Sequence, residues 1–164
     1  MKNLYIVRHG KSTWDIEQIS DIDRPLKERG IRDGYMMANR LIEKGHVPEL
    51  IVSSPAARAI HSATIFARTF KLPHHRIILN EGIYHAGTSN MLKIIQQTQD
   101  DLSSLMVFGH NPTFTDLANF FINKEIDNIP TTGIVGLKFE IKSWKEINKQ
   151  KSVDWFFDFH KNID

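Results

Sequence analysis

The sequence contains no cysteine, which excludes disulfide bonds, thiolate metal sites, iron–sulfur clusters and a cysteine nucleophile. It also has no uninterrupted run of about 18 apolar residues, and its first apolar run, residues 4–7, is far shorter than a signal-peptide core. Neither sign of charge dominates, since 21 basic and 19 acidic side chains leave a formal charge of +2. So small a charge indicates neither a nucleic-acid nor a membrane surface. We therefore expect a cytoplasmic protein with no nucleic-acid or membrane partner.

The composition is typical of one folded domain. Hydrophobic residues make up 41% and charged residues 24% of the 164 positions, which excludes a disordered chain. A domain of this length can bury about two thirds of the surface that its unfolded chain exposes, enough for a core without cross-links. We expect a single domain over residues 1–164.

Short apolar runs alternate along the chain with stretches whose apolar residues recur every three or four positions. The runs predict strands, and the periodic stretches predict helices. The expected strands are residues 2–7, 50–54, 76–79, 104–112, 133–141 and 154–160, with a Lys-rich turn before the last one. The expected helices run from Pro25 to a stop at Gly45, from Pro55 to Phe70, over about 89–97, and over 114–122. This order predicts a three-layer α/β sandwich: a mostly parallel central sheet with helices on both faces and an antiparallel edge formed by the last two strands.

Basic side chains follow three of the expected strands. Arg8 and His9 come directly after the first, Arg58 lies just beyond the second, and His110 ends the fourth. Ligands of open α/β sheets bind at the carboxyl ends of strands, so we expect these four side chains to meet at one edge of the sheet. Any one of them alone is as well explained by the ordinary polarity of surface loops. Because all four share one position in the predicted fold, a ligand-binding site is a better explanation for the set than the polarity of surface loops.

Four such donors without a ring of carboxylates are suited to a dianionic phosphoryl group. Arginine guanidinium groups bind phosphate oxygens through two hydrogen bonds at once. A neutral imidazole adds what arginine cannot, because it is a nucleophile able to form a covalent intermediate. Neighbouring arginines disfavour the protonated, cationic form of the histidine and so lower its pKa below the ordinary value of about 6.5. The pattern therefore indicates phosphoryl chemistry centred on a histidine.

The sequence resembles the histidine phosphatase superfamily, which has the phosphoglycerate mutase-like fold. The matching segments occur in family order: YIVRHGKSTWD (5–15), SSPAARAIHSA (53–63), LNEGIYHA (79–86), VFGHNP (107–112) and TTGIVGLKF (131–139). The resemblance implies that His9 is the nucleophile that becomes phosphorylated, that Arg8 and Arg58 bind the phosphoryl oxygens, and that His110 stabilises the transition state. Because the chain is short and has no insertion after the third strand, it is most similar to the SixA-type phosphohistidine phosphatases.

The resemblance leaves the general acid open. Glu81 stands where the mutase-like branch carries a proton-donating glutamate, but His85 replaces the glycine usual after the tyrosine, and Asp23 is a rival carboxylate. The role of His85 also stays open. Asp15 is excluded from the site, since an ionised carboxylate there would repel phosphate. Further candidates for binding phosphate are Ser12 and the backbone of Asn111, for which turn capping is the alternative.

Eight histidines invite a metal hypothesis, but no HExxH motif or EF-hand loop is present, so we expect neither metal nor cofactor. The favoured function is a metal-independent phosphatase acting on phosphohistidine of a protein partner. A small-molecule phosphomonoesterase on the same scaffold is the first alternative. A non-catalytic phosphate-binding module is the second, although His9 and His110 argue against it because a binder needs no nucleophile.

Overall fold

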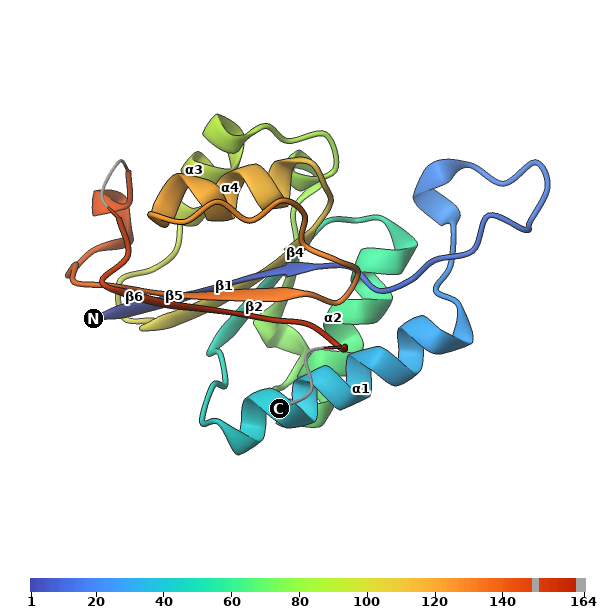
Figure 1. Ribbon diagram of the computed structural model, residues 1–164, viewed down its shortest axis with the longest axis horizontal. Helices are drawn as coiled ribbons and strands as arrows, with labels where there is room; N and C mark the ends of the chain where they lie inside the picture. Colours follow the sequence, from blue (N-terminus) through green and yellow to red (C-terminus); the bar gives the residue numbers. More distant parts are fainter. Residues whose placement is uncertain (149–150, 162–164) are drawn as a thin grey trace.

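Within residues 1–148 and 151–161, which the computed structural model describes, six strands form one mixed sheet in the order β3-β2-β4-β1-β5-β6 (Figure 1). The first four strands in the chain are parallel to one another, whereas β5 is antiparallel to β1 and β6 is antiparallel to β5. The prediction of a mostly parallel sheet with an antiparallel edge is confirmed. The strands are β1 (Lys2–Arg8), β2 (Leu50–Ser53), β3 (Ile77–Leu79), β4 (Ser104–Gly109), β5 (Ile134–Phe139) and β6 (Asp154–Asp158).

Helices cover both faces of the sheet, as Figure 1 shows. On one face lie α1 (Glu28–Glu43) and α2 (Ala57–Phe70), and on the other lie α3 (Thr88–Gln96) and α4 (Thr113–Phe121). Each helix turns its periodic apolar stripe toward the sheet, so the molecule has two cores, one on each face. The described helices include none that is long and apolar enough to cross a membrane.

The first two long helices end close to where the sequence predicts, but both begin later, and α1 begins at Glu28, not at the predicted Pro25. Helix α1 ends at Glu43, and Gly45 follows in the left-handed conformation with φ of 77°, as its predicted role as a stop requires. Helix α2 begins at Ala57, not at the predicted Pro55. The reason is that Ala56 is extended and donates its N–H to Ser54 Oγ at 3.2 Å, which makes a turn of the residues before the helix. This turn places Arg58 in the first turn of α2, beside the end of β2.

The segment between β5 and β6 is more than a Lys-rich turn. It contains the 3-10 helix η4 (Trp144–Glu146), which begins with a capping box between Ser143 and Glu146. The Trp144 side chain is fully buried, and its indole N–H donates to the carbonyl of Leu102 at 2.8 Å. The apolar ring therefore ties this connection to the core, while residues 149–150 lie outside the described part of the chain.

The parallel register brings three strand ends together. Arg8 pairs with Gly109 across β1 and β4, and Ser53 pairs with Phe108 across β2 and β4. The backbone continues these ladders beyond the strands, since the N–H of His9 donates to Gly109 O at 3.1 Å and that of Ser54 to Phe108 O at 3.0 Å. Side chains that follow the three strands consequently share one edge of the sheet.

Candidate active site

His9 lies at the centre of this edge with its imidazole held in one orientation. Its Nδ1 is 2.8 Å from the carbonyl oxygen of Gly10, which can only accept, so Nδ1 carries the proton and Nε2 keeps its lone pair. The side chain is 7% exposed, and burial is the main cause that lowers its pKa to about 3; His110, Arg58 and Arg8 add to the effect. At neutral pH, His9 is therefore an uncharged imidazole with a free Nε2, the form that can act as a nucleophile.

His110 follows β4, and its ring centroid lies 5.1 Å from that of His9. Its Nε2 is 2.8 Å from Ser54 Oγ, which also accepts the N–H of Ala56. The serine hydroxyl can thus donate its own proton to Nε2, which leaves the proton of the neutral imidazole on Nδ1. Burial first and Arg58 second lower the pKa of His110 to about 4. His110 is therefore a neutral imidazole next to His9, with Nδ1 able to donate a hydrogen bond.

Two arginines flank the histidines. Arg58 is 5% exposed; its Nη1 donates to the backbone carbonyl of Asp21 at 2.6 Å, and its Nη2 lies 3.0 Å from Asp21 Oδ2. Arg8 Nη1 donates to the carbonyl of Ile129 at 3.0 Å, and burial lowers the pKa of Arg8. These contacts fix both outer nitrogens of Arg58 and one outer nitrogen of Arg8, and they leave the Nε of each arginine for another partner.

Four buried polar atoms from these segments have no hydrogen-bond partner among the described residues: Arg8 Nε, Arg58 Nε, His110 Nδ1 and Thr132 Oγ1. Thr132 belongs to the group because its N–H donates to the carbonyls of both Arg8 and His9, at 3.0 and 3.1 Å. Buried polar atoms in folded proteins nearly always have partners. These four donors belong to segments that meet beside His9, and two of them are cationic, so an oxyanion is the kind of ligand that their chemistry suits.

A hydrogen-bond chain ties the loop of the nucleophile to α2. The N–H of Gly10 donates to Ser62 Oγ at 2.9 Å, and the Ser62 hydroxyl donates to the carbonyl of Arg58 at 2.7 Å. Gly10 is also closely packed, because a Cβ there would stand 3.2 Å from Gly30 O and from a methyl group of Leu26. His9 and Arg58 are thereby held relative to each other through the backbone.

The less certain sequence candidates lie around this centre. Glu81, in η3 (Glu81–Ile83), is exposed, and its carboxylate makes no hydrogen bond or ion pair with the described residues; its role as general acid stays a prediction. Asp23 is exposed and accepts from Ser20 Oγ at 2.7 Å. His85 is exposed, its ring centroid lies 4.3 Å from that of Tyr84 with the two rings tilted, and it lowers the pKa of His110, so it borders the site.

The two further phosphate candidates are engaged with other residues. Ser12 is buried, and its Oγ accepts from Arg24 Nη1 at 2.8 Å. The side chain of Asn111 donates to Asn128 and to the Ile129 carbonyl and accepts from Thr115. Both side chains therefore support loops around the site, and a phosphate contact from Ser12 or from the Asn111 backbone stays a prediction.

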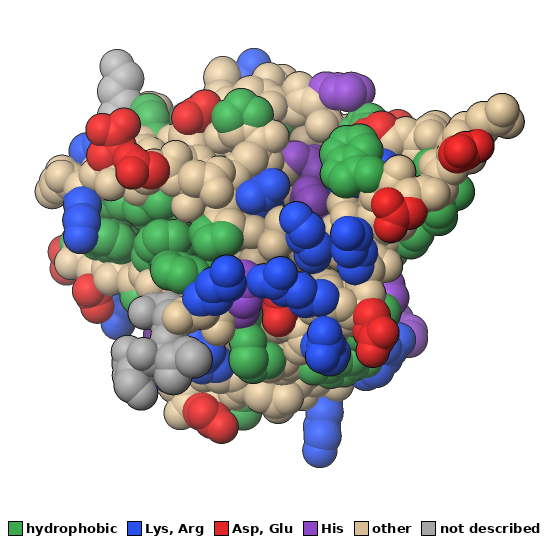
Figure 2. All heavy atoms as spheres, turned by 45° about the vertical axis from the view of Figure 1, so that its right-hand side comes forward, with side chains coloured by type: hydrophobic (Ala, Val, Ile, Leu, Met, Phe, Trp, Pro, Cys, Tyr) green, Lys and Arg blue, Asp and Glu red, His purple; other side chains and the backbone are tan. Residues whose placement is uncertain are grey.

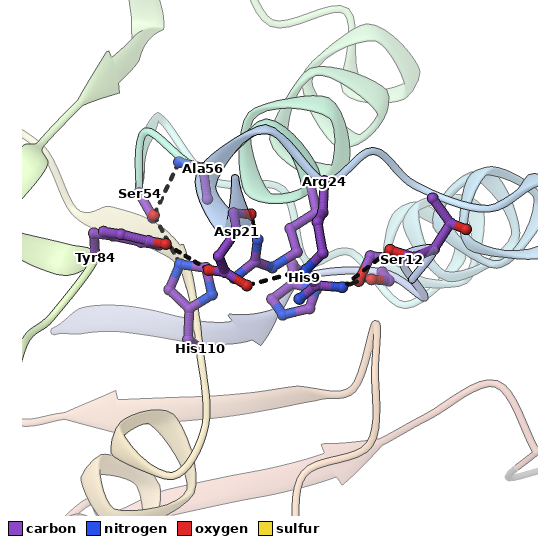
Figure 3. A network of polar contacts seen from close by, with 11 residues as sticks. His9, Ser12, Asp21, Arg24, Ser54, Ala56, Tyr84 and His110 are labelled. Atoms are coloured by element: carbon purple, nitrogen blue, oxygen red, sulfur yellow. Dashed lines mark hydrogen bonds and ion pairs between the residues drawn. The ribbon is translucent and has the colours of Figure 1, made fainter. Parts of the chain in front are cut away.

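Sequence reasoning missed Asp21, Arg24, Tyr84 and Thr132. Asp21, in η1 (Asp21–Asp23), contacts Arg58, and its Oδ2 also accepts the Tyr84 hydroxyl (Figure 3). The available signals were the DIDRPL segment, in which only Asp23 was considered, and the TTG that precedes β5. Neither shows which carboxylate or hydroxyl points inward, because a 3-10 turn and a positive φ at Thr132 (62°) decide it.

No group of three or more histidine, aspartate or glutamate side chains in the described ranges is arranged to hold a metal ion. The side chains gathered beside His9 are those of a second neutral histidine and two arginines.

The fold and this site define a class: an α/β sandwich with two neutral histidines and two arginines gathered at the carboxyl ends of its parallel strands. The chain belongs to the histidine phosphatase superfamily, whose branch 1 sequence profile matches residues 4–84. An uncharacterised protein of Mycobacterium tuberculosis is 30% identical over 112 residues, which are 68% of this chain and 67% of that protein.

Solved structures agree with this assignment. A protein of Agrobacterium tumefaciens described as the phosphohistidine phosphatase SixA is similar with a TM-score of 0.79 and 25% identity, covering 94% of this chain and 97% of that one. A mycobacterial glucosyl-3-phosphoglycerate phosphatase shares the fold at a TM-score of 0.70 and 13% identity, covering 97% of this chain and 98% of its own. The family and these neighbours support a phosphatase activity.

Proposed function

We propose that this protein is a metal-independent phosphatase that works through a covalent phosphohistidine on His9 and that its substrate is phosphohistidine on a protein partner. The observation that carries the proposal is the set of buried donors without partners around a neutral histidine: Arg8 Nε, Arg58 Nε, His110 Nδ1 and Thr132 Oγ1. A tetrahedral phosphoryl group offers three oxygens to such donors and a phosphorus atom to the nucleophile.

In the first step, the Nε2 lone pair of His9 attacks phosphorus in line with the leaving group. The bond from phosphorus to the substrate nitrogen breaks, and the leaving imidazole takes the electron pair and then a proton from solvent. The arginines and the neutral His110 stabilise the charge on the equatorial oxygens. The depressed pKa of His9, about 3, keeps the attacking nitrogen unprotonated at cellular pH.

In the second step, water attacks phosphorus and the bond to His9 Nε2 breaks. Inorganic phosphate leaves, and His9 returns to its starting form. The carbonyl of Gly10 holds Nδ1–H throughout, so the ring stays oriented for the next turnover. No step requires a group other than the substrate, water and side chains of this chain.

The surroundings of the site favour a large substrate. Trp14, on the loop after His9, is 75% exposed, and Ile16 is 46% exposed, so this loop presents two large apolar side chains to solvent. Figure 2, turned toward this edge, shows Lys and Arg side chains gathered below the histidines. Lys11 and Lys27 are exposed and adjacent, since the N–H of Lys27 donates to Lys11 O at 2.8 Å. An apolar and basic rim is suited to an acidic protein surface that presents a phosphorylated side chain.

The test is a comparison of substrates in the presence of a metal chelator. The purified protein is incubated with a histidine-phosphorylated protein, with phosphoserine and phosphotyrosine peptides, and with small phosphoesters, and the release of phosphate is followed. We expect the highest kcat/KM on the phosphohistidine protein, without loss on adding chelator. Higher kcat/KM on a small phosphoester would identify a phosphomonoesterase instead, and phosphate binding without turnover would identify a binding module.

A further inference from the structure

One carboxylate, that of Asp21, links three segments around Arg58. Its Oδ2 accepts from Arg58 Nη2 and from the Tyr84 hydroxyl, and its Oδ1 accepts from Arg24 Nε at 3.0 Å. Its main-chain oxygen accepts from Arg58 Nη1 at 2.6 Å. Figure 3 shows Asp21 between Tyr84 and Arg24, close to His110. Arg58 therefore meets this one residue through two of its three guanidinium nitrogens.

The loop that carries Asp21 is itself fixed by Arg24. Arg24 Nη1 donates to Ser12 Oγ at 2.8 Å and to the carbonyl of Thr13 at 3.2 Å. Its guanidinium also lies 3.5 Å from the ring centroid of Trp14. Asp21 thus has a defined place although its side chain is 47% exposed.

The carboxylate does not fill the oxyanion place. With Asp21 bound to Nη1 and Nη2, Arg58 Nε stays buried and without a partner among the described residues, as do Arg8 Nε and His110 Nδ1. If Asp21 imitated the phosphoryl group, its oxygens would contact these inner donors. It binds the outer side of the guanidinium instead.

We propose that Asp21 is a positioning residue for Arg58: it anchors two nitrogens of the guanidinium so that Nε is held ready for the phosphoryl group. The inference rests on the proposed phosphoryl site but adds a residue outside it. A long arginine side chain loses rotamer freedom when it binds an anion, and an anchor present beforehand reduces that cost on binding. The hydroxyl of Tyr84 and the two arginines lower the pKa of Asp21, so the anchor is charged at all physiological pH values.

The experiment measures the affinity for tungstate, a tetrahedral oxyanion, by calorimetry, which needs no turnover. The proteins are the wild type, Asp21→Asn, Arg58→Ala and the double variant. We expect Asp21→Asn to weaken tungstate binding about tenfold, the effect of losing a hydrogen bond between charged groups. In the Arg58→Ala background the same substitution should have no further effect, because an anchor acts only through the residue it holds.

A matched control is Asp15→Asn, which removes the same charge from the same loop at an exposed position that makes no contact with Arg58. It should leave the affinity unchanged. A second variant, Tyr84→Phe, removes one donor from Oδ2 and should weaken binding about threefold. It keeps the test decisive if Asp21→Asn proves unfolded by circular dichroism.

Three results would overturn the proposal. Tighter tungstate binding by Asp21→Asn would mean that the carboxylate competes with the anion. Unchanged binding would mean that Arg58 needs no anchor. A tenfold loss that persists in the Arg58→Ala background would mean that Asp21 acts independently of Arg58. If the coupling is found but no substrate is hydrolysed, the proposed catalytic function fails while the positioning role stands.

Discussion

The site has a strand side, formed by Arg8, His9 and His110, and a loop side, formed by Asp21 and Tyr84, and the two sides are built differently. Arg8, His9 and His110 lie directly at the ends of β1 and β4, where backbone hydrogen bonds continue the sheet. Asp21 and Tyr84 lie on loops, and their contacts are made by side chains that are partly or largely exposed. Arg58 belongs to both sides, since α2 carries it and Asp21 holds its outer nitrogens. In the proposed mechanism the strand side supplies the reacting groups, and we expect the loop side to adjust them.

This difference has a physical basis. A group at the end of a buried strand is placed by several backbone hydrogen bonds and by close packing, which resist displacement. A group on an exposed loop is placed by a few side-chain bonds, each contributing little in water. Substitutions on the strand side should therefore have large effects on activity with any substrate, and those on the loop side should have smaller effects that depend on the substrate.

The largest effect is expected from His9→Ala. Without the nucleophile no phosphoenzyme forms, and kcat should fall at least about 10⁴-fold, as for other covalent catalysts that lose the attacking group. The fold should persist because His9 follows the strand and lies outside the two apolar cores. Single-turnover kinetics measure the loss of activity, and circular dichroism checks that the fold persists. Activity near the wild-type level would remove His9 from its assigned role.

A companion measurement on the wild type traps the phosphoenzyme with radiolabelled substrate. A phosphorus–nitrogen bond should survive alkali and hydrolyse in acid. An adduct stable to acid would indicate a serine or threonine ester in its place.

Arg58→Ala should have the next largest effect, since it removes the cation that the proposed mechanism places against the phosphoryl group and that both sides of the site hold. Losing one such donor lowers kcat about 10²-fold. Inhibition by phosphate should weaken in parallel, which steady-state assays with phosphohistidine protein can measure. Unchanged inhibition would place Arg58 outside the oxyanion site.

Glu81→Gln tests whether a residue on a loop acts as the general acid, because its effect should depend on the substrate. An alkoxide leaving group needs a proton in the transition state, whereas the imidazole of phosphohistidine leaves with much less help. If Glu81 is the acid, hydrolysis of an alkyl phosphate should fall about 10²- to 10⁴-fold and hydrolysis of phosphohistidine much less. The two rates are measured for both proteins across pH. Equal losses would indicate that Glu81 only positions its loop, and no loss would return the role to Asp23 or to solvent.

The smallest effect concerns stability on the strand side. The folded pKa of His9, about 3, lies below its ordinary value of 6.5, so the unfolded chain binds more protons as the pH falls below 6.5. The free energy of unfolding should therefore decrease between pH 6.5 and pH 3, by up to about 1.4 kcal/mol per pH unit for this residue. Urea denaturation at pH 7 and pH 5 measures the change, and His9→Gln should reduce it. An identical change in both proteins would mean that His9 is not buried in its neutral form.

The sequence by itself determined the alternation of strands and helices and the position of Arg8, His9, Arg58 and His110 at strand ends. Apolar runs and period-3.6 apolar patterns are local, and parallel strands necessarily end on one edge of a sheet. The start of α2 was misplaced because a turn through Ser54 Oγ was not recognisable from Pro55 alone.

Only the tertiary structure decided which loop groups reach the site. Asp21 and Asp23 stand two residues apart in one 3-10 turn, yet only Asp21 contacts Arg58. Tyr84 reaches the same carboxylate from 63 positions away along the chain. Such contacts depend on how irregular loops pack over a finished sheet, and no short-range periodicity in the sequence records that packing.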